Sequence, residues 1–103
     1  MITILFHMTV KAERDLEWQA LVSQLTRSTR NDDAGCLNYT YPRQVDSQYE
    51  YVLYEQWADE AALAAHLARL VRVLGPPPPG GRLPAKFLDR FEQSRVARYE
   101  ALE

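Results

Sequence analysis

Two segments of the chain are mostly apolar or aromatic on both of their alternating sides, and this limits what the chain can fold into. They read ITILFHMTV at residues 2–10 and YEYVLYEQW at residues 49–57. Both are rich in β-branched, aromatic and other apolar residues, so each predicts a strand. A strand with one face in water would alternate apolar with charged residues. Neither side of these strands suits water, so we expect both faces of their sheet to be covered.

The two sides of strand 2–10 differ in what we expect to cover them. Phe6 lies on one side with the apolar residues at alternate positions, and we assign that side to a second copy of the chain. Leu5 and His7 lie on the other side, which we assign to the helices. An apolar surface of this size points to a partner. The sequence therefore predicts a homodimer joined through its sheet faces.

Two segments have the pattern of amphipathic helices. In residues 13–30, acidic residues come early, basic residues come late, and an apolar stripe is spaced i, i+3, i+4 and i+7: Trp18, Leu21, Val22 and Leu25. Gly35 in NDDAG can end this helix. The second helix should begin after Asp59, whose carboxylate can cap it, and end at Gly75.

The other segments predict two more strands and a short helix. Strands at 36–43 and 49–58, joined by the polar QVDSQ, favour an antiparallel hairpin. PPPPGG at 76–81 cannot form a helix or a central strand and predicts a stiff surface connector. LPAKFLDRF then resembles a short helix. EQSRVARYEAL suits a fourth strand, with a continued helix over residues 84–102 as the alternative.

The order of elements is therefore β-α-β-β-α-β, which predicts an α+β, ferredoxin-like fold. Its four-stranded antiparallel sheet should carry both helices on one face. A length of 103 residues suits one domain over residues 1–103, with the 76–81 connector inside it.

Composition excludes several classes of function. A net charge of -2 with no basic stripe argues against nucleic acid, and no apolar run approaches the ~20 residues that a membrane span needs. The single Cys36 cannot form an internal disulfide, which favours a cytoplasmic protein. There is no glycine-rich phosphate loop or dinucleotide motif, so no organic cofactor is indicated. Two histidines without nearby carboxylates at ligand spacing do not predict a metal site.

Three motifs together resemble one known family. GCLNYTY, YVLYEQWAD and EAALAAHL look like the corresponding segments of the antibiotic biosynthesis monooxygenase family, whose members are small dimeric α/β barrels and include quinol monooxygenases. The resemblance covers residues 1–74 and is sharpest over 35–67. It implies a homodimeric, cofactor-independent monooxygenase that uses O2 to oxidise a small aromatic substrate: a quinol, an anthrone or a polyketide phenol.

Two other functions fit the same resemblance. Haem-degrading relatives have similar tryptophan and histidine positions but pair them with an asparagine on the first strand, where this chain reads LFHMT. A non-enzymatic, ligand-binding dimer would use the fold only as a scaffold.

The resemblance also implies two catalytic residues. Trp57 matches a family tryptophan that borders the ligand cavity, where its indole N–H can hold a substrate oxygen; core packing is the alternative. His66 matches the family histidine and, independently, faces inward because it lies three residues after Leu63 and four before Leu70. We expect it to act as a base or proton shuttle, with a hydrogen-bonded core histidine as the alternative.

Four more residues are candidates for substrate binding. His7 should share a cavity with His66, because we assign both to the helix side of the sheet. Glu55 falls on the tryptophan side of its strand and could act as a base, orient a histidine or pair with an arginine at the rim. Asn38 faces either the cavity or the partner. Tyr51 is a strand aromatic that could contact an aromatic substrate.

Overall fold

A computed structural model of the chain describes residues 1–102. Its elements follow in the order β1 (Ile2–Val10), η1 (Ala12–Arg14), α1 (Asp15–Asp32), β2 (Cys36–Thr40), β3 (Glu50–Trp57), α2 (Glu60–Leu74), α3 (Ala85–Leu88) and β4 (Phe91–Tyr99).

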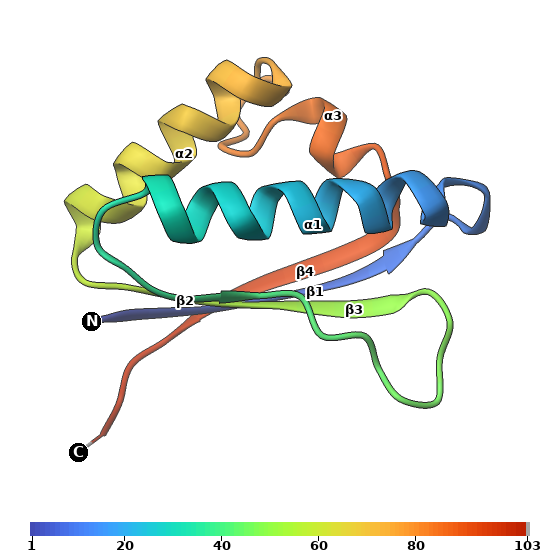
Figure 1. The fold of residues 1–103 in the computed structure, drawn as a ribbon, viewed down its shortest axis with the longest axis horizontal. Helices are drawn as coiled ribbons and strands as arrows, with labels where there is room; N and C mark the ends of the chain where they lie inside the picture. The colour runs from blue at the N-terminus through green and yellow to red at the C-terminus, as the bar shows by residue number, and fades with distance from the viewer. Residues whose placement is uncertain (103) are drawn as a thin grey trace.

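The strands form one antiparallel sheet in the order β2-β3-β1-β4, and all the helices lie on one face of it (Figure 1). This confirms the predicted ferredoxin-like fold. Phe91–Tyr99 is a strand and not the continuation of a helix, because it pairs along β1. Strand β2 ends at Thr40, short of the predicted residue 43, and beyond it Arg43 makes only an isolated bridge to Tyr51.

The predicted faces of β1 are reversed in the structure. Phe6 pairs with Leu53, is 4% exposed, and sets its ring 6.1 Å from that of Phe87 under the helices. His7 pairs with Val52 on the bare face. Residues opposite one another in an antiparallel pair point to the same face. The assignment of Phe6 to a partner and of His7 to the helix side was therefore wrong, since the more continuously apolar side of β1 is the one that the helices bury.

An aromatic cluster joins α1 to the sheet. Trp18 is completely buried, with its ring centroid 5.4 Å from that of Tyr41 and 5.2 Å from that of Phe91. Both pairs meet edge to face, the arrangement that aromatic quadrupoles favour. The stripe predicted from Trp18 to Leu25 is therefore the core-facing side of α1.

Helix α2 begins as the sequence predicts. The Oδ1 of Asp59 accepts a hydrogen bond from the backbone N–H of Ala62 at 2.8 Å. This satisfies one of the free N–H groups of the first turn. Gly75 at the other end has a φ of 105°, and the proline connector follows it.

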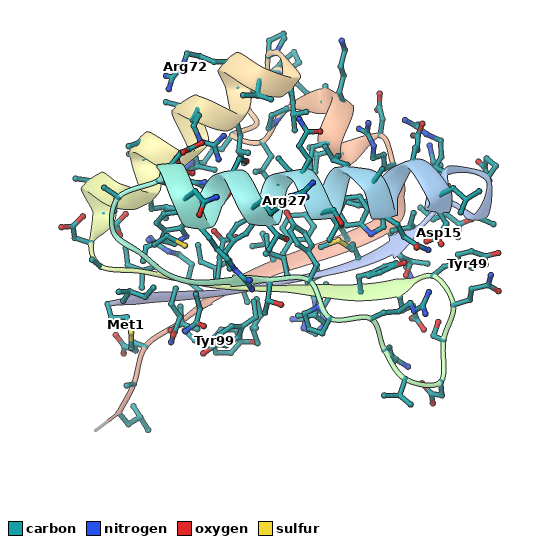
Figure 2. The ribbon with its side chains drawn as sticks, in the orientation of Figure 1. Met1, Asp15, Arg27, Tyr49, Arg72 and Tyr99 are labelled. Atoms are coloured by element: carbon teal, nitrogen blue, oxygen red, sulfur yellow. The ribbon has the colours of Figure 1, made fainter. Side chains whose placement is uncertain are left out.

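The face of the sheet without helices is half apolar. Leu5 pairs with Tyr54 there, and Ala97 lies opposite Leu5 on the other side. Figure 2 shows Tyr99 projecting from this same face, away from the helices. Within residues 1–102 no helix is long and apolar enough to cross a membrane.

Gly35 gives a test of how closely the α1–β2 turn approaches α2. Its φ is 83°, and an added Cβ would lie 2.6 Å from the Cβ of Ala62. Gly80 has a similar φ of 77° but nothing within 4 Å. Both Gly→Ala changes incur the ~1 kcal/mol strain of a left-handed residue, and Gly35→Ala adds about 1–3 kcal/mol of overpacking. Urea unfolding should therefore rank Gly35→Ala well below Gly80→Ala, and equal stabilities would contradict the close approach.

Candidate functional site

A cavity of about 200 Å³ lies between the sheet and α2. Most of its walls are aliphatic or aromatic, and its polar groups are few. Ligand sites combine apolar walls with a small number of converging polar groups in this way. Its polar and charged lining residues are Tyr39, Glu55, His66, Arg82 and Arg98.

The carboxyl group of Glu55 is buried at the floor of this cavity and is 6% exposed. Its Oε1 accepts a hydrogen bond of 2.6 Å from the indole N–H of Trp57. No cation in residues 1–102 pairs with it. Burial raises the pKa of Glu55 from 4.5 to about 7, although the Trp57 hydrogen bond opposes this. Near neutral pH the group can therefore hold or accept a proton, as a general base must.

Trp57 lies behind the cavity wall, whereas we expected it to border the cavity. The side chain is completely buried and is absent from the cavity lining. Its N–H is already bonded to Glu55, and its ring centroid lies 4.5 Å from that of His66. Trp57 thus holds the two titratable groups in place, and its N–H is not free for a substrate oxygen.

His66 faces inward as predicted, and the structure gives it a partner. Its Nδ1 lies 2.6 Å from Oδ2 of Asp33, and the residue is 1% exposed. Burial lowers the pKa of His66 even though Asp33 opposes this, so the ring is neutral near pH 7. A neutral ring that donates through Nδ1 to a carboxylate carries its lone pair on Nε2. His66, which lines the cavity, therefore keeps Nε2 as its hydrogen-bond acceptor.

Arg69 completes this network. Its Nε and Nη2 bind the two carboxylate oxygens of Asp33 at 2.6 and 2.9 Å, and Nη2 also reaches Thr29 Oγ1 at 3.1 Å. Burial raises the pKa of Asp33, but the hydrogen bonds from Arg69 and His66 outweigh burial and hold it below its usual value. Asp33 thus stays ionised and ties the end of α1 to α2.

Sequence reasoning missed Asp33 as part of the site. It treated NDDAG only as a helix stop. One signal was available, because an acidic residue at the C-terminal end of a helix is disfavoured by the helix dipole. Such a residue suggests a cation or donor elsewhere in the fold, which here is supplied by Arg69 and His66.

The structure places three predicted site residues away from this cavity. His7 lies on the bare face of the sheet, so its predicted sharing of a cavity with His66 is wrong. Asn38 is exposed, and its Nδ2 donates to Oε1 of Gln56 at 2.7 Å. Tyr51 is buried beside α1, where its hydroxyl donates to Oδ1 of Asp15 at 3.0 Å.

A larger hollow, of about 510 Å³, lies on the bare face next to His7. It is open where the β2–β3 loop meets β1 and β4. That face is the one for which the sequence predicts a second copy of the chain. The buried carboxyl group and the neutral histidine are both in the smaller cavity, so the smaller cavity is the candidate site.

Glu55→Gln tests the burial of the carboxyl group. The pKa of this carboxyl group is 4.5 in the unfolded chain and about 7 in the folded protein, so at a pH between these two values mainly the folded protein holds the proton. The stability that comes from this difference in proton binding is lost as pH rises. The free energy of unfolding of the unaltered protein, relative to Glu55→Gln, should fall by about 3 kcal/mol between about pH 4 and about pH 8. Urea unfolding of both proteins across this range measures it. A difference independent of pH would contradict the raised pKa.

Solved structures with the same fold are numerous, at low sequence identity. A protein from Deinococcus radiodurans, assigned by name to the antibiotic biosynthesis monooxygenases, is 21% identical, with 100% of this chain and 94% of that chain covered and a TM-score of 0.74. One from Nitrosomonas europaea with the same assignment is 16% identical, with 100% of both chains covered and a TM-score of 0.77. A conserved protein from Methanosarcina mazei Go1 is 20% identical over 95% of this chain and 89% of that chain, with a TM-score of 0.71.

These similarities show the fold. No curated protein matches the sequence significantly. The family model of antibiotic biosynthesis monooxygenases, however, matches residues 1–70, which include β1, β2, β3 and most of α2, all of which line the cavity. The chain belongs to the antibiotic biosynthesis monooxygenase family.

Proposed function

We propose that the protein is a cofactor-independent monooxygenase that oxidises a small, electron-rich phenol or quinol with O2. One observation carries this proposal above the others. A carboxyl group with a pKa near 7 lines an apolar cavity together with a neutral histidine. Such a cavity suits removal of a proton from a phenol in the absence of bulk water.

The chemistry needs a base because triplet O2 reacts slowly with closed-shell molecules. A phenolate can pass one electron to O2, and recombination of the two radicals forms a peroxide anion at the ring carbon, which takes up the proton removed from the phenol to become a hydroperoxide. Loss of water from this peroxide leaves a quinone, with one oxygen atom of O2 in the product and the other in water. The substrate supplies both electrons, so the protein has to bind, deprotonate and stabilise the anion.

Glu55 and His66 divide the proton transfers in this proposal. Ionised Glu55 accepts the phenolic proton, since its pKa near 7 matches the working pH. His66 accepts, through Nε2, the ring proton that is lost as the O–O bond breaks, and returns it to the departing hydroxide, which leaves as water. The sequence alone gave the role of base to His66. Because no cation within residues 1–102 offsets the burial of Glu55, its pKa is raised to about 7, and this favours its carboxylate as the base that removes the phenolic proton.

The volume of the cavity limits the substrate. About 200 Å³ is below the ~300–1,000 Å³ usual for ligand sites, which favours one or two aromatic rings over a larger polyketide. The same volume argues against the haem alternative. Titration with haem should accordingly give no Soret shift.

We also propose that a second copy covers the bare face of the sheet. Leu5, Tyr54 and Tyr99 lie on this face, none of them under a helix. A stable dimer would bury more than ~1,000 Å² there. The dimer would also close the larger hollow beside His7.

Substitution of the two titratable groups tests the proposed reaction. Glu55→Gln keeps an acceptor for Trp57 but removes the base, and His66→Phe keeps bulk but removes both nitrogens. Each should lower kcat/KM for a naphthoquinol by ~10²–10⁴-fold, the usual contribution of a general base. Isotopically labelled O2 should place one labelled atom in the product, which separates enzymatic turnover from autoxidation.

The pH profile and a control sharpen this test. The kcat/KM of the unaltered enzyme should rise with pH through a midpoint near 7 as Glu55 ionises. Glu13→Gln removes an exposed carboxylate on η1 and should change nothing. Full activity of Glu55→Gln would refute its role as the base, and full activity of His66→Phe would show that His66 only packs.

Leu5→Glu tests the proposed dimer. A charge on the bare face should prevent association, because it would be buried without a partner. Leu16→Glu is the matched control, since Leu16 lies on α1 and is 84% exposed. Light scattering should give a dimer for the unaltered protein and for Leu16→Glu, and a monomer for Leu5→Glu. A monomeric unaltered protein would refute the proposal.

A further inference from the structure

One row of paired residues crosses the floor of the cavity. Tyr39 pairs with Glu55, Glu55 pairs with Ile4, and Ile4 pairs with Arg98. All four side chains line the cavity. Adjacent strands lie about 4.8 Å apart, so the backbone positions of Glu55 and Arg98 are separated by about 10 Å across the sheet. The floor therefore carries an acid on β3 and an arginine on β4, with Ile4 between them.

Arg98 is available at the mouth of the cavity. Its only ion pair within residues 1–102 joins Nη2 to Oε1 of Glu60 at 2.7 Å, and both side chains are about half exposed or more. Exposed pairs of this kind contribute little stability, so a bound anion can replace or share this contact. A guanidinium binds a carboxylate through two parallel hydrogen bonds, which adds directional specificity.

A second arginine lines the same cavity from the connector. Arg82 lines the cavity and follows directly after PPPPGG. Four consecutive prolines restrict the backbone, and the N–H of Gly81 bonds to the carbonyl of Pro78 at 2.9 Å. No ion pair of Arg82 is formed within the described part of the chain. The stiff connector thus places a positive charge beside the cavity at a low entropic cost.

We propose that the substrate is an aromatic acid, with its phenolic hydroxyl at Glu55 and His66 and an anionic substituent, a carboxylate, held at the mouth by Arg98 and Arg82. This rests on the proposed function and narrows it to a substrate class. The aromatic body lies over the apolar side chains between the two ends, such as Ile4 and Leu53. The two arginines determine specificity and orientation, because holding the carboxylate directs the hydroxyl toward the base.

A matched pair of probes tests this proposal without turnover. The probes are a naphthoquinone with a carboxylate on its second ring and the same naphthoquinone with a neutral carboxamide there. Calorimetric titration of the unaltered protein should show the carboxylate binding roughly tenfold more tightly, as expected for a charge-assisted hydrogen bond at a partly exposed site. Added salt should reduce this preference.

Variants locate the preference on the two arginines. Arg98→Gln should lower the preference for the carboxylate probe several-fold, and Arg98→Lys should retain part of this preference. The double change Arg82→Gln with Arg98→Gln should abolish it. Arg72→Gln is the control, because Arg72 lies on α2 and points away from the sheet (Figure 2). It should behave as the unaltered protein does. Circular dichroism confirms that each variant is folded.

The outcomes separate this proposal from the proposed reaction. Equal affinity for both probes in the unaltered protein, or a preference that survives the double change, overturns the aromatic acid as substrate. The reduced probes, with labelled O2, report on the reaction. If the carboxylate binds selectively but neither quinol is oxidised, the monooxygenase proposal fails and the site for an aromatic acid stands. If both quinols are oxidised with equal kcat/KM, the monooxygenase stands and the aromatic-acid proposal fails.

Discussion

The burial of one carboxyl group beneath α2 is the constraint on which the rest of the site depends. Glu55 has one hydrogen bond, from Trp57, and no cation among residues 1–102 to offset its charge. Loss of water therefore raises its pKa to about 7. A stable core would be simpler with an apolar residue here. A group that is costly to ionise yet poised near neutral pH is typical of a functional site.

The second polar network keeps this arrangement in place. Asp33 joins the end of α1 to His66 and Arg69 of α2, so the two helices are linked above the cavity. The same contact fixes the orientation of the imidazole ring and leaves Nε2 as its acceptor. Trp57 touches both networks, through its N–H to Glu55 and its ring to His66. One completely buried side chain thus contacts both titratable groups.

The fold by itself does not fix the reaction or the substrate. The same four-stranded sheet occurs in proteins that share only about a fifth of their residues with this chain. In this chain two arginines line the cavity, and one of them follows a proline connector beyond residues 1–70 that match the family model.

Local patterns in the sequence determined the order of the elements, the cap at Asp59 and the inward direction of His66, because periodicity and capping act between neighbouring residues. Alternation also placed Glu55 and Trp57 on one side of their strand. Which side of β1 the helices cover was decided only by tertiary structure, and for His7 the sequence prediction was wrong. The Asp33 contact and the row from Glu55 to Arg98 likewise join residues more than 30 positions apart. The alternation of residues along a strand shows which side chains lie on the same face of that strand. Only strand pairing and helix packing decide whether that face is covered by the helices.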